Sequence, residues 1–155
     1  MFDWTSSKGV TMKIAFGADP NAAELKMQLI EVATVLGHEV DDFGSADPIY
    51  AHVAADVAEA VAAGRYDRGV VLCGTGIGVS IAANKVDGAY CALLSDVYSA
   101  ERAQLSNNAN MVAFGAQVVG AEVAKALLTT YLAVSFDKDG RSREKVAAIV
   151  DYESR

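Results

Sequence analysis

The 155-residue sequence has the length of one ordinary domain, and its hydrophobic content of 52% is enough for a single buried core. The formal net charge of -7 at pH 7 excludes the basic surface of a typical nucleic-acid-binding protein. No apolar run is long enough to span a bilayer and the N-terminus carries no secretory signal pattern, so we expect a cytoplasmic protein without a membrane partner.

Cysteine and histidine usage predicts no metal or other cofactor. Cys73 and Cys91 are expected to be free thiols, with Cys91 in the core. The cysteines and the two histidines, His38 and His52, do not stand at metal-ligand spacings.

Strand and helix patterns alternate along the chain after residue 11. Residues 1–11 have no periodicity and Met12 precedes the first strand pattern, so we interpret 1–11 as disordered or as an extension, with Met12 as an alternative start, and 12–155 as one domain. The predicted strands are 13–18, 38–44, 69–74, 89–95 and 111–116. The predicted helices are 21–37, 49–64, 77–85, 97–106, 121–136 and 141–155.

This alternation predicts an α/β fold. Strands joined through helices of this length make right-handed crossovers and form a parallel sheet covered on both faces. We therefore expect a three-layer, doubly wound, Rossmann-like sheet of about five parallel strands. The helix at 141–155 is extra, because no strand remains for it to cover, and such a helix usually docks on a partner or closes over a site.

Candidate site residues are those expected directly after the strands, because ligands bind at the carboxyl ends of an open parallel sheet. We assign to this edge Asp19, Asn21, residues 73–78, Ser95, Asp96 and residues 107–110. The alternative for Asp19 is a helix cap, and the alternative for Asn107, Asn108 and Asn110 is a turn.

The segment 73–78, CGTGIG, joins a thiol to a glycine-rich turn that leads into a helix. Glycines let successive backbone N–H groups converge and the helix N-terminus adds positive potential, so the turn suits an anion. It lacks the P-loop lysine, and a dinucleotide-binding motif would follow the first strand instead. The same potential favours a thiolate and makes Cys73 a candidate base or nucleophile, the alternative being a small buried side chain beside glycines that serve packing.

Five segments together resemble the ribose-5-phosphate isomerase B family, which includes the galactose-6-phosphate isomerase subunits. They are KIAFGAD at 13–19, LGHEVDDFG at 36–44, CGTGIGVSIAANK at 73–85, NNAN at 107–110 followed by AFGAQVVG at 113–120, and GRSREK at 140–145. The resemblance runs from about Lys13 to the C-terminus. It implies the fold predicted above and a metal-independent enzyme of carbohydrate metabolism, the pentose phosphate pathway included.

The resemblance also implies an activity, in which an aldose phosphate and its ketose interconvert through a cis-enediolate. Cys73 would be the base, and active sites shared between subunits would require a homodimer or a dimer of dimers. The residues implied for catalysis are Cys73, Thr75 and Asp19; those for substrate and oxyanion binding are Gly74, Gly76, Ile77, Gly78, Tyr50, Ser106 and Asn107; those for the phosphate are Arg141 and Lys145.

Departures from the family pattern bear on the substrate. Pro20 and Ser106 stand where the family usually has histidines, and Gln117 and Lys145 stand where it has arginines. The family histidine that Ser106 replaces is credited with opening the furanose ring. A tetrose 4-phosphate has its C4 oxygen esterified and cannot form a furanose, so we hypothesise an acyclic substrate such as erythrulose 4-phosphate. The alternatives are ribose 5-phosphate, a hexose 6-phosphate of the galactose type, and a noncatalytic sugar-phosphate-binding protein.

Overall fold

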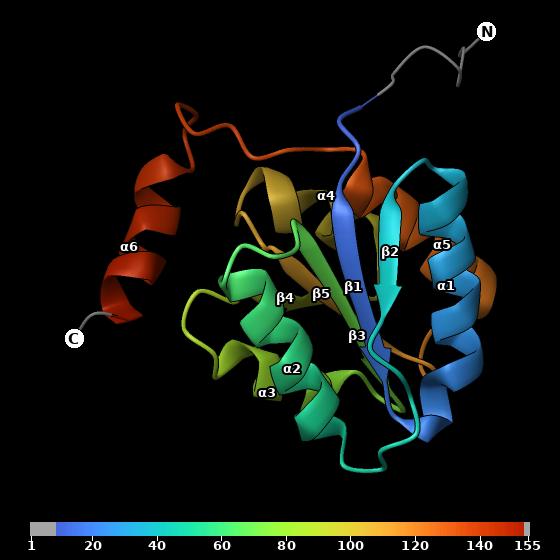
Figure 1. Ribbon diagram of the computed structural model, residues 1–155. Helices are drawn as coiled ribbons and strands as arrows, with labels where there is room; N and C mark the ends of the chain where they lie inside the picture. The colour runs from blue at the N-terminus through green and yellow to red at the C-terminus, as the bar shows by residue number, and fades with distance from the viewer. Residues whose placement is uncertain (1–8, 154–155) are drawn as a thin grey trace, which may run out of the picture.

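The computed structural model describes residues 9–153 and contains one five-stranded sheet (Figure 1). Its strands are β1 (Lys13–Ala18), β2 (Glu39–Asp42), β3 (Arg68–Cys73), β4 (Cys91–Leu93) and β5 (Met111–Gly115). They are all parallel and lie in the order β2-β1-β3-β5-β4, which confirms the predicted doubly wound fold. The expected extension at 1–11 falls mostly on residues 1–8, outside the described residues.

Two strands are shorter than predicted. β2 and β4 are the edges of the sheet, so each has a single hydrogen-bonded neighbour and its ladder covers only three or four residues. The central strands β1, β3 and β5 match the predicted ranges to within one residue.

Helices cover both faces of the sheet, as Figure 1 shows for α2 and α3 on one side and α1 and α5 on the other. A short 3-10 helix, η1 (Pro20–Ala22), leads into α1. The helices are α1 (Ala23–Val35), α2 (Tyr50–Ala62), α3 (Ile77–Asn84), α4 (Val97–Leu105), α5 (Ala121–Leu132) and α6 (Arg143–Glu153). Among the described residues, no helix is both long and apolar enough to cross a membrane.

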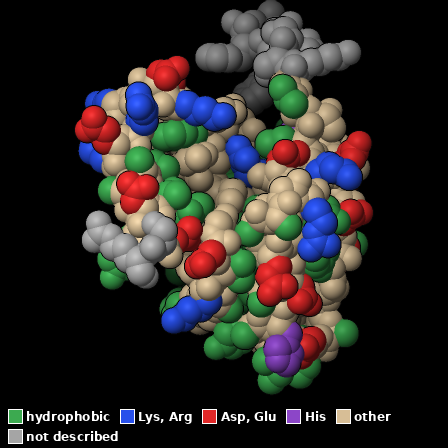
Figure 2. Space-filling model, turned by 60° about the vertical axis from the view of Figure 1, so that its left-hand side comes forward, with side chains coloured by type: hydrophobic (Ala, Val, Ile, Leu, Met, Phe, Trp, Pro, Cys, Tyr) green, Lys and Arg blue, Asp and Glu red, His purple; other side chains and the backbone are tan. Residues whose placement is uncertain are grey.

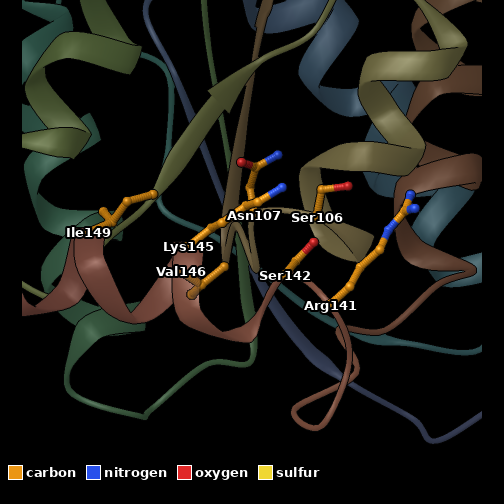
Figure 3. A pocket seen from close by; sticks show the side chains of 7 residues that line it. All are labelled: Ser106, Asn107, Arg141, Ser142, Lys145, Val146 and Ile149. Carbon is orange, nitrogen blue, oxygen red and sulfur yellow. The ribbon is translucent and has the colours of Figure 1, made fainter.

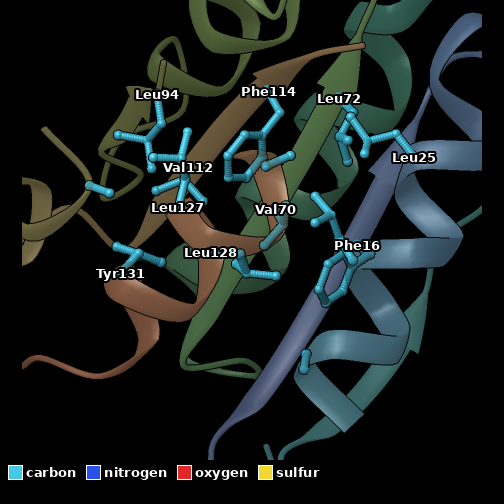
Figure 4. Packing of buried hydrophobic residues seen from close by; sticks show 14 of the residues in the cluster. Phe16, Leu25, Val70, Leu72, Leu94, Val112, Phe114, Leu127, Leu128 and Tyr131 are labelled. Carbon is cyan, nitrogen blue, oxygen red and sulfur yellow. The ribbon is translucent and has the colours of Figure 1, made fainter. Parts of the chain in front are cut away.

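Alternating strand side chains build two cores, one on each face. Phe16 and Phe114 pack with Leu127 and Tyr131 of α5 in the larger cluster (Figure 4). The next residues along the strands face α2 and α3, and this second cluster includes Cys73. The strand that ends in Cys73 is therefore fixed from both sides.

The extra C-terminal helix, α6, is confirmed, and it stands apart from both layers (Figure 1). None of its described residues is buried. Glu153 in its last turn accepts hydrogen bonds from the Gly88 N–H at 3.3 Å and from the Tyr90 hydroxyl at 2.8 Å. Burial and this hydrogen bond raise the pKa of Tyr90 to about 12.

Candidate active site

Cys73 is the last residue of β3 and lies at the point where the strand order reverses between β1 and β3. Its side chain is buried, at 4% exposure, and its sulfur accepts a hydrogen bond from the Gly76 N–H at 3.1 Å. This bond holds the sulfur in the turn through the main chain that follows it.

The turn depends on glycine at position 76. Gly76 has a φ of +76°, and a Cβ there would lie 2.6 Å from the Leu93 side chain and 2.8 Å from the Phe114 carbonyl carbon. The neighbouring strand β5 thus closes over the turn, since a Cβ at Gly115 would also collide with the Thr75 backbone. This close approach leaves the turn one conformation.

Thr75 is exposed beside the thiol, and its Oγ1 accepts the Ile77 N–H at 3.2 Å. Two of the amides expected to face an oxyanion, those of Gly76 and Ile77, are therefore turned toward Cys73 and Thr75. Gln117 lies against Gly74, since a Cβ there would meet its carboxamide at 3.4 Å. The sequence marks Gln117 only as a departure from a family arginine, and its place beside this turn was missed.

Tyr50 and Asp19 border the same end of the sheet. The Tyr50 ring covers Gly78 so closely that a Cβ there would overlap it. Asp19 is 5% exposed, and its N–H donates to the carbonyl of Leu72, the residue before Cys73, at 3.2 Å. Its carboxylate accepts the Asn21 N–H at 2.9 Å, so the alternative role of Asp19 as a helix cap is confirmed. Asp96 likewise caps α4.

A second cluster surrounds a cavity of about 350 Å³ between α6 and the loop after α4 (Figure 3). The cavity is lined by Ser106, Asn107, Arg141, Ser142, Lys145, Val146 and Ile149. Figure 2 shows Lys and Arg side chains gathered over the beginning of α6. Two cations in one cavity of a protein with net charge -7 favour an anionic ligand.

The placement of residues 107–110 at the carboxyl edge was wrong. They follow α4 and precede β5, so they lie at the amino edge, where the Asn110 carbonyl accepts the Gly69 N–H. Helix α4, which connects β4 to β5, returns the chain from the carboxyl edge to the amino edge before these residues. The turn alternative holds for Asn108, which has a φ of +49°. The Asn110 side chain instead accepts the Tyr90 N–H and donates to the Gly88 carbonyl, about twenty residues earlier in the chain.

One chain therefore holds two separate groups of predicted site residues. The Gly69–Met111 pair and the Cys73–Gly115 pair are four residues apart along the sheet, which is about 13 Å at the rise of a parallel strand. Cys73, Thr75, Asp19 and Tyr50 lie at the carboxyl edge, and Ser106, Asn107, Arg141 and Lys145 near the amino edge. We call these the thiol half-site and the tail half-site.

This chain is similar to known isomerases of sugar phosphates. Residues 14–149 match the family described as Ribose/Galactose Isomerase. D-erythrulose-4-phosphate isomerase of Pectobacterium atrosepticum is 42% identical over 92% of this chain and 95% of its own length. Ribose-5-phosphate isomerase B of Escherichia coli is 41% identical over 92% and 97%. The structure of Clostridium thermocellum ribose-5-phosphate isomerase B has a TM-score of 0.87 at 39% identity, over 92% and 98% of the two chains.

The fold, the glycine turn and these similarities define the class: the protein is an aldose–ketose isomerase of sugar phosphates. The chain belongs to the ribose/galactose isomerase family.

Proposed function

We propose that this protein interconverts a short acyclic ketose phosphate and its aldose, with D-erythrulose 4-phosphate as substrate and Cys73 as the base. The observation that carries the proposal is the Cys73 sulfur, buried at the reversal point of the sheet and held by the Gly76 amide. At this place the sulfur is shielded from water and faces an N–H donor, and a positioned side chain of this kind can act as a general base.

The reaction moves one proton between carbons and one between oxygens. The Cys73 thiolate takes a proton from C1 of the ketose, the C1–H electron pair forms the C1=C2 bond, and the carbonyl electrons move to O2. The thiol then returns the proton to C2, while the O1 proton passes to O2 and C1 becomes the aldehyde. N–H groups at Gly74 and Gly78 and the Thr75 hydroxyl stabilise the developing oxyanion.

Ser106 supports the acyclic substrate. A serine hydroxyl does not exchange protons near neutral pH as an imidazole does, so it is a poor ring-opening group. A 4-phosphorylated tetrulose has no furanose form and needs no such group. Arg141 and Lys145 bind the phosphate, Arg141 with its planar guanidinium and Lys145 as a point charge.

A homodimer completes the site. The two half-sites of one chain lie at opposite edges of the sheet, so the thiol half-site of one copy combines with the tail half-site of a second copy. The separation along the sheet supports this arrangement, since a tetrulose phosphate is shorter than the about 13 Å between the two edges. The surface near the thiol half-site supports it too. Apolar side chains are exposed there on α3, β4 and the start of α4: Ile77, Ile81, Leu93, Val97 and Tyr98. Several large exposed apolar side chains on neighbouring elements are typical of an interface.

The substrate is tested by kcat/KM for D-erythrulose 4-phosphate and ribose 5-phosphate, measured side by side with Cys73→Ser as the blank. We expect a preference for the tetrulose. Good turnover of ribose 5-phosphate with none of the tetrulose would contradict the acyclic substrate.

The shared site is tested by mixing two inactive variants. Cys73→Ser and the double variant Arg141→Ala, Lys145→Ala each spoil a different half-site, so hybrid dimers contain one intact site. After subunit exchange an equal mixture should recover about a quarter of wild-type activity. Cys73→Ser mixed with Thr75→Ala is the matched control, because both changes affect the same half-site and no hybrid has an intact one. Recovery equal to that control would exclude the shared site.

A further inference from the structure

Arg102, on α4, is hydrogen-bonded to both polar residues that the loop after α4 contributes to the tail cavity. Its Nη1 donates to Ser106 Oγ at 3.3 Å. Its main-chain carbonyl accepts from the Asn107 amide nitrogen at 3.0 Å. Arg102 itself does not line the cavity, whereas Ser106 and Asn107 do (Figure 3). One residue therefore sets the orientation of two cavity groups.

These two bonds leave Ser106 and Asn107 with opposite hydrogen-bonding roles toward the cavity. A guanidinium has donors and no acceptor, so Ser106 must accept from Arg102, and its own hydroxyl proton is left for another partner. The Asn107 nitrogen is held by the helix carbonyl, which turns its amide oxygen away from that carbonyl. Ser106 thus offers a donor and Asn107 an acceptor. A phosphate oxygen needs a donor such as Ser106, and a sugar hydroxyl can donate to an acceptor such as Asn107.

The surroundings of Arg102 argue against a purely structural role. Its Nη2 pairs with Glu101 at 2.9 Å and its guanidinium lies 5.9 Å from the Tyr98 ring centroid. Among the described residues, however, its Nε is buried without a hydrogen-bond partner. An unsatisfied buried donor destabilises a fold, so stability alone does not favour arginine here.

We propose that Arg102 is a positioning residue for substrate recognition: its guanidinium holds Ser106 as an acceptor, so that the Ser106 hydroxyl donates to a phosphate oxygen of the sugar phosphate. The proposal rests on the proposed function only in taking the tail cavity as the phosphate site. It gives Ser106 a task other than ring opening.

The test is a double-mutant cycle in kcat/KM with Arg102→Met and Ser106→Ala. Each single change should lower kcat/KM by about threefold to tenfold, mainly through KM, and the double variant should be little worse than Arg102→Met alone. The melting temperature of Arg102→Met should not fall, because the unpaired Nε is removed with the side chain. Arg102→Lys should recover less than half of the loss, since an ammonium lacks the fixed fork of donors.

Arg68→Met is the matched control. Arg68 is the other arginine whose Nε is buried and unpaired among the described residues, but it lies at the start of β3 and does not line the cavity. Its KM should stay at the wild-type value. Multiplicative losses in the cycle, or an equal rise in KM for Arg68→Met, would overturn the role of Arg102.

The cycle is run with whichever of D-erythrulose 4-phosphate and ribose 5-phosphate the wild type turns over faster. A preference for ribose 5-phosphate would overturn the proposed substrate and leave Arg102 to be judged by the coupling. Inorganic phosphate gives a second readout: it should raise the melting temperature of the wild type and of Arg68→Met more than that of Arg102→Met. Equal protection of all three would also count against Arg102.

Discussion

The two half-sites are built in opposite ways. Around Cys73, a buried central strand, a glycine turn and the adjacent β5 backbone pack so closely that a side-chain carbon at Gly76 would collide with its neighbours. Around Arg141 and Lys145, the supporting helix buries none of its described residues and is tied to the body through Glu153 in its last turn. Proton transfer requires a fixed geometry, whereas an anion is bound well by cations that can adjust. The rigid region is suited to chemistry and the looser one to recognition.

The sharpest way to break this comparison is Cys73→Ser. A hydroxyl is a far weaker base than a thiolate, so kcat should fall by about 10²–10⁴-fold while KM changes little. Steady-state kinetics with the preferred sugar phosphate measure both. Cys91→Ser is the control, since burial raises the pKa of that thiol to about 12 and it lies outside both half-sites. Undiminished turnover by Cys73→Ser would assign the base to another group.

Gly76→Ala tests whether the turn is as rigid as its packing indicates. In the alanine variant, the strained positive φ and the collision of the new Cβ with the Phe114 backbone should lower the free energy of unfolding by about 2–4 kcal/mol. Urea denaturation gives the value. Gly120→Ala should be nearly neutral, because Gly120 has a φ of -67° and open space around its Cβ position. Equal stabilities of the two variants would mean that β5 moves aside easily.

Arg141→Ala removes a cation from the looser region. A hydrogen bond to a charged group contributes about 1.5–3 kcal/mol, so KM should rise by about 10–100-fold with a smaller change in kcat. Arg143→Ala removes the same charge from the first turn of α6 at a residue that does not line the cavity. If both variants raise KM equally, the effect is one of general charge rather than of the cavity.

Glu153→Ala should have the smallest effect on activity. Loss of the bonds to Gly88 and Tyr90 loosens α6, so amide hydrogen exchange in the helix should speed up and KM should rise about two- to fivefold. The pKa of Tyr90 should fall, because the hydrogen bond to Glu153 contributes to raising it to about 12. Ultraviolet titration of the phenol measures that fall. Glu144→Ala, at the other end of α6, should leave the Tyr90 pKa unchanged.

The central sheet and the thiol half-site were predictable from local pattern. Apolar strands such as β3 and the glycine turn after Cys73 each consist of consecutive residues, so a short stretch of sequence is enough to recognise them. Their geometry follows from backbone sterics. The edge of the sheet at which Asn107 lies was missed, although its place between a helix and a strand contains that information. The tie of Glu153 to Gly88 and Tyr90 spans more than sixty residues and has no local signal.

If the tail half-site, at the far edge of the sheet, completes the thiol half-site of a second copy as proposed, the enzyme should respond to dilution. A chain that completes the active site of its neighbour has no complete site of its own when it is alone. Specific activity should then be constant at high enzyme concentration and decline as subunits separate, following mass action rather than unfolding. The affinity between copies would in that case set the lowest concentration at which the catalyst exists at all.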